Sequence, residues 1–224
     1  MRTRKRKQVS EKSLELNVCA EILQIIRTSF PRAVWLGLTQ MQERRLGLDE
    51  LIRNVGPGRH LMLQFKAPWA TSKPNYLYKF GLEDQQYGRL RRLAQRYPSG
   101  VYYVFPLYST WRKVDQDAPD LTRDTWLVPV ARIPVNQAAG KQQHKVFFQK
   151  SLNAPSVAAV VDDPEEITDL LNAHEFFGSD SVATGNRSVP SEAVREWFQA
   201  ETLGQDAAVR FRGLNSIFVP SSQR

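Results

Sequence analysis

The chain has a single cysteine, Cys19, in 224 residues, so a disulfide framework and a cysteine-based zinc cluster are excluded. Its three histidines, His60, His144 and His174, are too far apart in the sequence to suggest a metal motif. No apolar run approaches the roughly 18 residues that span a bilayer. The charged N-terminus is not followed by the apolar segment of a signal peptide. We therefore expect no membrane segment, no export and a cytoplasmic protein.

Positive charge is in excess, with 31 Lys and Arg against 23 Asp and Glu and a formal net charge of +8. This excess of positive charge indicates what the protein can bind rather than which fold it adopts. It favours nucleic acid first and an acidic membrane surface second. Part of the excess lies in residues 1–9, which we interpret as a flexible basic tail that aids solubility rather than as a binding arm.

The apolar and polar pattern of residues 10–135 predicts a mixed α/β core. Helices are expected at 10–29, with Ser10 as N-cap, and at 83–97; strands at 34–38, 47–54, 60–66, 101–105 and 125–133; loops at 69–76 and 112–124. A strand, a helix and a strand in succession predict a crossover and a parallel pair. Residues 136–224 are expected to form a small, mostly helical C-terminal extension, with helices at 163–176 and 191–203 joined by a loop at 178–190.

The run Gly56-Pro57-Gly58-Arg59 predicts a type II turn that joins two of these strands in a hairpin. A two-residue loop sets Asp49 opposite Lys66, and a four-residue loop sets Asp49 opposite Gln64. In both registers Asp49, Gln64 and Lys66 share one face. The other face is apolar and carries Leu61, Leu63 and Phe65. An ordinary solvent-facing polar strand is the alternative interpretation.

The first expected helix carries a carboxylate, Glu15, near the middle of its apolar arc when residues are placed about 100° apart. A carboxylate on a buried stripe is costly unless it is paired, protonated or bound to a metal. Glu15 lies only one turn from the helix start, so a side chain that reaches solvent is an equal alternative.

These residue types suit one kind of chemistry. Asp49 and Glu15 offer carboxylate oxygens, and Gln64 offers an amide oxygen, to Mg²⁺ or Mn²⁺. Lys66 beside a metal can orient or help deprotonate a water and offset phosphate charge. The combination predicts hydrolysis of phosphodiester bonds.

The pattern resembles the PD-(D/E)xK nuclease superfamily over roughly residues 10–110. The resemblance rests on Glu15, on Gly47-Leu48-Asp49 and on Leu63-Gln64-Phe65-Lys66 after a hairpin turn. It implies a restriction endonuclease-like core, with Asp49 as central metal ligand, Gln64 in the second acidic position, Lys66 as catalytic lysine and Glu15 as accessory acid. Glutamine replaces the usual acid and removes one negative charge from the metal site. Glu43, in a run similar to E-x-x-x-G-x-D, is interpreted as structural, paired with a neighbouring arginine.

Two groups of residues could contact nucleic acid. Arg89, Arg92 and Arg96 lie on one face of the second expected helix and could neutralise phosphates. Lys79 follows the QxK strand together with the aromatic residues Trp69, Tyr76 and Tyr78, which could stack on a base. A solvated helix face and ordinary packing are the alternative interpretations of the two groups.

We therefore expect a Mg²⁺- or Mn²⁺-dependent DNA endonuclease, and the resemblance suggests a setting in restriction or phage defence. A homodimer or a partner protein is left open. The alternative is a nuclease-fold protein that binds nucleic acid or scaffolds a complex without cutting, and Gln64 favours it. A third, weaker interpretation is a module whose basic surface meets an acidic protein.

Overall fold

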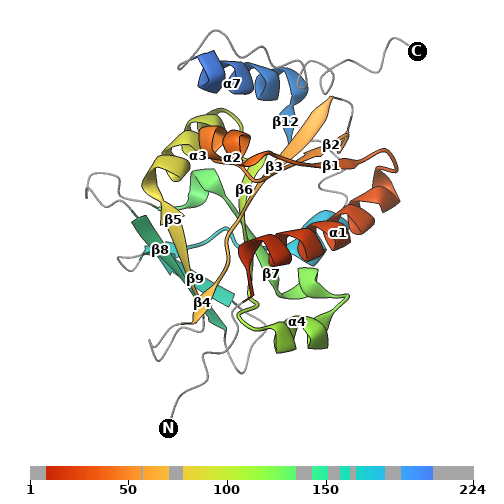
Figure 1. Ribbon diagram of the computed structural model, residues 1–224, viewed down its shortest axis with the longest axis vertical. Coiled ribbons are helices and arrows are strands. Elements are labelled where there is room, and N and C mark those ends of the chain that lie inside the picture. The colour runs from red at the N-terminus through yellow and green to blue at the C-terminus, as the bar shows by residue number, and fades with distance from the viewer. Residues whose placement is uncertain are drawn as a thin grey trace.

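The computed structural model describes residues 9–56, 58–70, 78–134, 143–150, 157–161, 165–179 and 188–203. These residues form an α/β structure in which helices flank a mixed sheet and a second sheet lies beside it (Figure 1). Within the described part of the chain, no helix combines the length and the apolar character needed to cross a membrane.

The larger sheet is mixed. Its order is β1-β2-β3-β6-β7-β11, with β12 paired to β3. Only the β3–β6 pairing is parallel among the pairings described. The strands are β1 (Val34–Gly37), β2 (Glu50–Arg53), β3 (Arg59–Phe65), β6 (Val101–Pro106), β7 (Thr125–Pro129), β11 (Leu171–Asn172) and β12 (Val189–Pro190).

The smaller sheet is antiparallel, in the order β10-β9-β8-β5-β4. Its strands are β4 (Trp69–Ala70), β5 (Tyr78–Glu83), β8 (Gln143–Lys150), β9 (Val157–Val161) and β10 (Glu165–Ile167). Because β8 pairs with β5, a hairpin from the second half of the chain completes a sheet that the first half begins.

The helices divide between the two faces of the larger sheet (Figure 1). They are α1 (Glu11–Ser29), α2 (Gln40–Leu46), α3 (Asp84–Arg96), α4 (Trp111–Asp117), α5 (Ala173–Gly178) and α7 (Ser191–Leu203), with 3-10 turns η1 (Leu121–Asp124) and η2 (Val130–Arg132). α1 and α5 pack on one face, while α3, α7 and the smaller sheet share the core on the other. The central strand β6 is buried along its whole length, as a strand covered on both sides requires.

The hairpin follows one of the two expected registers. Arg53 pairs with His60 and Glu50 with Leu63, which is the register that places Asp49 opposite Gln64. Arg59 N donates to Gly56 O at 3.2 Å, and Gly58 has a φ of 61°; Pro57 lies outside the described residues. The expected separation of faces is confirmed, because Met62 packs in one core and Leu63 in the other.

Several expectations for the first half are confirmed and others are wrong. Ser10 caps α1 by accepting from Ser13 N at 3.1 Å, and the parallel β3–β6 pair follows the expected crossover. The expected loop at 112–124 is instead α4 followed by η1, because Thr110 caps a helix there and Val114 packs in the core. Of the expected tail 1–9, Val9 is buried, and residues 1–8 lie outside the described part. The expected loop 69–76 starts as β4.

Beyond residue 135 the described residues combine strands with helices, and the rest of the expected C-terminal extension 136–224 lies outside the described part of the chain. Strands β8, β9 and β10 precede α5, and the expected helix at 163–176 is β10, β11 and then α5. The reason is pairing, since β10 pairs with β9 and β11 pairs with β7. The helix expected at 191–203 is α7.

Candidate active site

Asp49 is positioned by the end of a helix and the start of a strand. Gly47 ends α2 with a φ of 70°, a conformation that favours glycine. A Cβ there would lie 3.1 Å from Gln86 Cγ and 3.2 Å from Gln86 O. The left-handed backbone and the close approach of α3 therefore favour glycine at this turn. The turn leads the chain into β2, and Asp49 lies just before that strand.

Asp49 and Gln64 are in direct contact. Gln64 Nε2 donates to Asp49 Oδ2, and Phe65 N donates to the same oxygen at 2.9 Å. Gln64 Nε2 also donates to Phe65 O at 3.1 Å. These two acceptors orient the amide, and they leave Gln64 Oε1 buried without a hydrogen-bond partner among the described residues. A buried acceptor of this kind is costly unless it meets a cation or a donor.

The two residues open into a pocket of about 410 Å³. We call it the Asp49 pocket. The pocket is predominantly polar and combines carboxylates with two cationic side chains; its lining residues are Glu11, Glu43, Gly47, Asp49, Gln64, Lys66, Glu83, Gln85, Gln86 and Arg89. The predicted residues Asp49, Gln64, Lys66 and Arg89 thus converge on one space.

Burial governs the charge state of Asp49. It raises the pKa of the Asp49 carboxyl to about 7, against the opposing effects of Lys66 and the hydrogen bond from Gln64. Glu11 and Glu15 raise it further. A carboxyl with a pKa near neutrality exchanges its proton readily at physiological pH.

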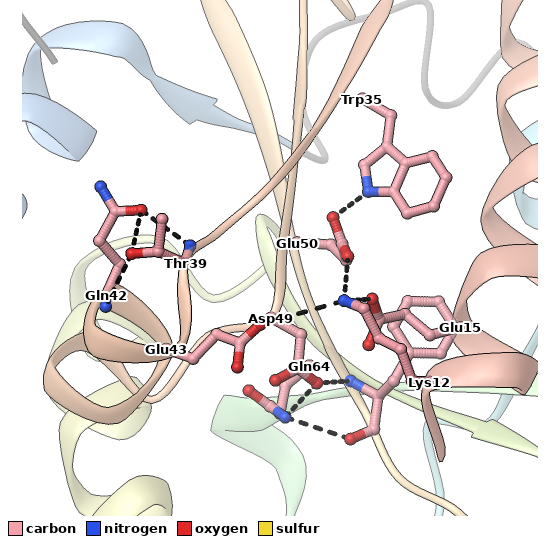
Figure 2. A network of polar contacts seen from close by, with 10 residues as sticks. Lys12, Glu15, Trp35, Thr39, Gln42, Glu43, Asp49, Glu50 and Gln64 are labelled. Atoms are coloured by element: carbon pink, nitrogen blue, oxygen red, sulfur yellow. Dashed lines mark hydrogen bonds and ion pairs between the residues drawn. The ribbon is translucent and has the colours of Figure 1, made fainter. Parts of the chain in front are cut away.

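Glu15 lies near Asp49, beside the pocket rather than on its wall. It is 3% exposed and does not line the Asp49 pocket. It forms a short ion pair with Lys12 and lies near enough to Glu50 to raise the pKa of that carboxyl. Figure 2 shows this cluster beside Asp49 and Gln64. Its role as a metal ligand stays a prediction, and the described contacts give it a different set of neighbours.

Lys12 joins three carboxylates. Besides Glu15, its Nζ lies 3.6 Å from Glu50 Oε1 and 4.0 Å from Glu43 Oε1 (Figure 2). Glu50 also accepts from Trp35 Nε1. Burial raises the pKa of the Glu50 carboxyl to about 9, and the neighbouring Glu15 carboxylate raises it further, against the opposing effects of Trp35 and Lys12. Glu50 therefore keeps its proton at neutral pH.

Sequence reasoning missed Glu50 and Lys12, and it gave Glu43 a different role. Glu43 was expected to have only a structural role, but it lines the Asp49 pocket and lies near Lys12. Strand alternation turns Glu50 away from Asp49, but its contact with Lys12 depends on how α1 packs across β2, and that packing leaves no local signal in the sequence.

The residues predicted to contact nucleic acid divide into two places. Arg89 is half-buried and lines the Asp49 pocket. Arg92 and Arg96 are exposed farther along α3, on the same face. Lys79 lies on β5, over the ring of Trp69 and outside the Asp49 pocket. Tyr78 is buried, and Tyr76 lies outside the described residues.

The donor set suits a loosely held Mg²⁺ rather than a closed metal cage. Among the described residues, no three His, Cys, Asp or Glu side chains are grouped to hold a metal ion. Mg²⁺ is commonly held by one or two carboxylates, with waters and substrate phosphate completing its shell. The Asp49 carboxylate and the unpartnered Gln64 Oε1 fit that pattern.

No protein-family model matches the chain, and neither a similar curated protein nor a similar solved structure was found. The residues of the Asp49 pocket are therefore the evidence for what this chain does.

Proposed function

We propose that this chain is a Mg²⁺- or Mn²⁺-dependent nuclease that hydrolyses DNA phosphodiester bonds in the Asp49 pocket. The observation that supports the proposal most strongly is the convergence of Asp49, Gln64 and Lys66 on one polar space. A restriction endonuclease-like core and a role in restriction or phage defence remain parts of the proposal.

Each residue has a role that follows from its position. Asp49 and Gln64 would hold the metal ion, which would supply Lewis acidity and a more acidic bound water. The Lys66 ammonium, half-buried at the pocket wall, offsets phosphate charge and orients the attacking water. Arg89, in the same pocket, attracts a neighbouring phosphate.

A second function is supported by a specific observation. Asp49 Oδ2 already accepts from both Gln64 Nε2 and Phe65 N, and glutamine lacks the charge of the family's usual acid. Such a pocket suits a protein that binds nucleic acid, or scaffolds a complex, without cutting it. Phosphate would then meet Lys66 and Arg89, with no hydrolysis.

Cleavage of supercoiled plasmid in Mg²⁺ or Mn²⁺ tests the first function. We expect the parent to nick or linearise the plasmid, and Asp49→Ala and Lys66→Ala to lose at least a hundredfold in rate. Asp115→Ala, a change at an exposed helical carboxylate, is the matched control and should cut like the parent. Equal cutting by all the variants would place the activity elsewhere.

Binding in EDTA separates the two functions. If the parent binds DNA but does not cut it under any divalent cation tested, the non-catalytic function is favoured. If the parent neither binds nor cuts, both fail.

A further inference from the structure

A second, smaller pocket of about 90 Å³ lies on the smaller sheet, and it differs in chemistry from the Asp49 pocket. Its lining residues are Trp69, Lys79, Phe80, Gly81 and Lys145. None of these residues lines the Asp49 pocket. Among the described residues, the lining of the smaller pocket combines two aromatic residues and two lysines with no carboxylate.

Strand pairing explains this arrangement. Trp69 on β4 pairs with Lys79 on β5, and Gly81 on β5 pairs with Lys145 on β8. Lys79 and Gly81 are two residues apart, so both point to the same face of the sheet. The intervening Phe80 is buried in the core, so the two lysines lie on the opposite face of the sheet, where Phe147, which pairs with Lys79, is also buried. Figure 1 shows β4, β5 and β8 side by side.

Trp69 is unusually available for contact. Its side chain is 58% exposed, although a tryptophan ring in water costs free energy in proportion to its apolar area. Lys79 Nζ lies 5.7 Å from the ring centroid, which holds a cation beside an exposed aromatic face. An exposed ring flanked by cations can stack with a base and attract the neighbouring phosphates.

The pocket is close to Lys66 along the chain. Trp69 follows Lys66 by three residues, and three extended residues span at most about 11 Å. Stacked nucleotides rise about 3.4 Å each along one strand. A strand with a phosphate at Lys66 could therefore place a base on Trp69 about three nucleotides away.

We propose that Trp69, Lys79 and Lys145 form a binding site for single-stranded nucleic acid, with an unpaired base stacked on Trp69 and phosphates at the two lysines. The placement of this strand next to the Asp49 pocket rests on the proposed nuclease function, whereas the binding itself does not. A blunt duplex keeps its bases stacked inside, so this site discriminates in favour of an unpaired strand.

Fluorescence anisotropy of labelled oligothymidine, oligouridine and a blunt duplex, all in EDTA, tests the site. We expect Trp69→Ala to weaken single-strand binding roughly tenfold and to leave duplex binding nearly unchanged. Trp69→Phe keeps a flat ring and should recover most of the loss. Lys79→Met and Lys145→Met should each reduce the slope of log affinity against log salt by about 0.7.

The control variants are in helix α4, outside the smaller pocket. Trp111→Ala and Arg112→Met alter an exposed ring and an exposed cation on α4 and should leave single-strand binding unchanged. Circular dichroism and melting temperature confirm that each variant folds. Parent-like single-strand binding by Trp69→Ala would overturn the proposal, as would an equal loss for the duplex. Competition by polyglutamate as effective as that by oligothymidine would overturn it in favour of an acidic protein partner.

The cleavage variants separate this site from the nuclease function. Asp49→Ala should keep Trp69-dependent single-strand binding even if all cleavage is lost. A chain that cuts plasmid but binds oligonucleotides independently of Trp69 refutes this site alone. A chain that never cuts but binds through Trp69 refutes only the hydrolysis.

Discussion

At the scale of single residues, Asp49 shows how burial and charge compete. Burial raises the pKa of its carboxyl to about 7, whereas an unfolded aspartate titrates near 3.9. The folded state therefore binds a proton that the unfolded state has released. The resulting stability is fully present below about pH 4 and is lost as the pH rises through about 7.

Asp49→Asn should therefore stabilise the protein increasingly as the pH rises. An asparagine oxygen can still accept from Phe65 N and Gln64 Nε2, but it carries no buried charge. We expect its advantage over the parent to grow by about 2–3 kcal/mol between pH 5 and pH 8, measured by urea unfolding. Asp115→Asn, at an exposed position, should show no such trend, and parallel pH profiles for the parent and Asp49→Asn would contradict the prediction.

Gln64→Glu restores the acid that the resemblance leads one to expect. Without a cation, the substitution places a second carboxyl against Asp49 and removes the amide donor. We therefore expect the free energy of unfolding to fall by about 2–4 kcal/mol at pH 8 in EDTA. Millimolar Mn²⁺ should then raise the melting temperature of this variant more than that of the parent.

The matched control for that substitution is Gln85→Glu, which adds the same charge at an exposed position of the same pocket. It should change stability by no more than about 0.5 kcal/mol. An absence of any cation-dependent shift in Gln64→Glu would argue against metal binding in this pocket and favour the non-catalytic function.

The residues of the pocket were predictable where strand alternation decides their direction. Asp49, Gln64 and Lys66 share a face in either hairpin register with an even loop, so their convergence needed no knowledge of the tertiary structure. The Lys12–Glu15–Glu50 cluster was not predictable in this way, because it depends on how α1 packs across β2. A helix can satisfy its apolar stripe at several rotations and heights, and only packing selects one.

At the scale of elements, predictions held where one local signal was strong. The buried run of β6 and the Ser10 cap of α1 are signals of this kind. Helix α2 was not predicted, although its capping box of Thr39 and Gln42 is a local signal of the same kind. The smaller sheet was harder, because β5 and β8 are separated by more than 55 residues in sequence, and such long-range pairing leaves no local mark.

Gly100 tests the fit between β6, in the middle of the chain, and β12, which comes much later in the sequence. A Cβ at this position would lie 2.4 Å from Val189 Cγ2 and 2.9 Å from the backbone of Ser188, so β12 closes directly over the start of β6. We expect Gly100→Ala to lower the free energy of unfolding by about 1–3 kcal/mol in chemical denaturation.

Gly178→Ala is the control for that substitution, because its nearest neighbour would be Ile25 Cγ2 at 4.0 Å. In the helical backbone of α5 it should be neutral or stabilising by up to about 1 kcal/mol. If Gly100→Ala leaves the free energy of unfolding unchanged, β12 can shift at little cost. The contact between Gly100 and Val189 would then not be what holds α7 in place.

At the scale of the whole molecule, the two cores lie on opposite faces of one sheet. Trp197 and Phe198 of α7 belong to the core that contains α3, while α1 belongs to the other. β3 and β6 supply alternate residues to both cores. A substitution that disrupts packing on one face is therefore expected to destabilise the other face through these shared strands. The pocket lies between these layers, with Asp49 before β2 and Gln64 on β3, and its geometry therefore depends on both.

Trp197→Ala tests this coupling. Trp197 is 8% exposed, and the truncation should lower the global stability by about 3 kcal/mol. If the described residues unfold as one cooperative unit, the most protected amides of α1, on the far face, should lose hydrogen-exchange protection by the same free energy as those of β3. Trp111→Ala, at a position 40% exposed, should cost much less. Unchanged protection in α1 would show that the face carrying α7 opens independently, and the Asp49 pocket would then open with it while α1 remained folded.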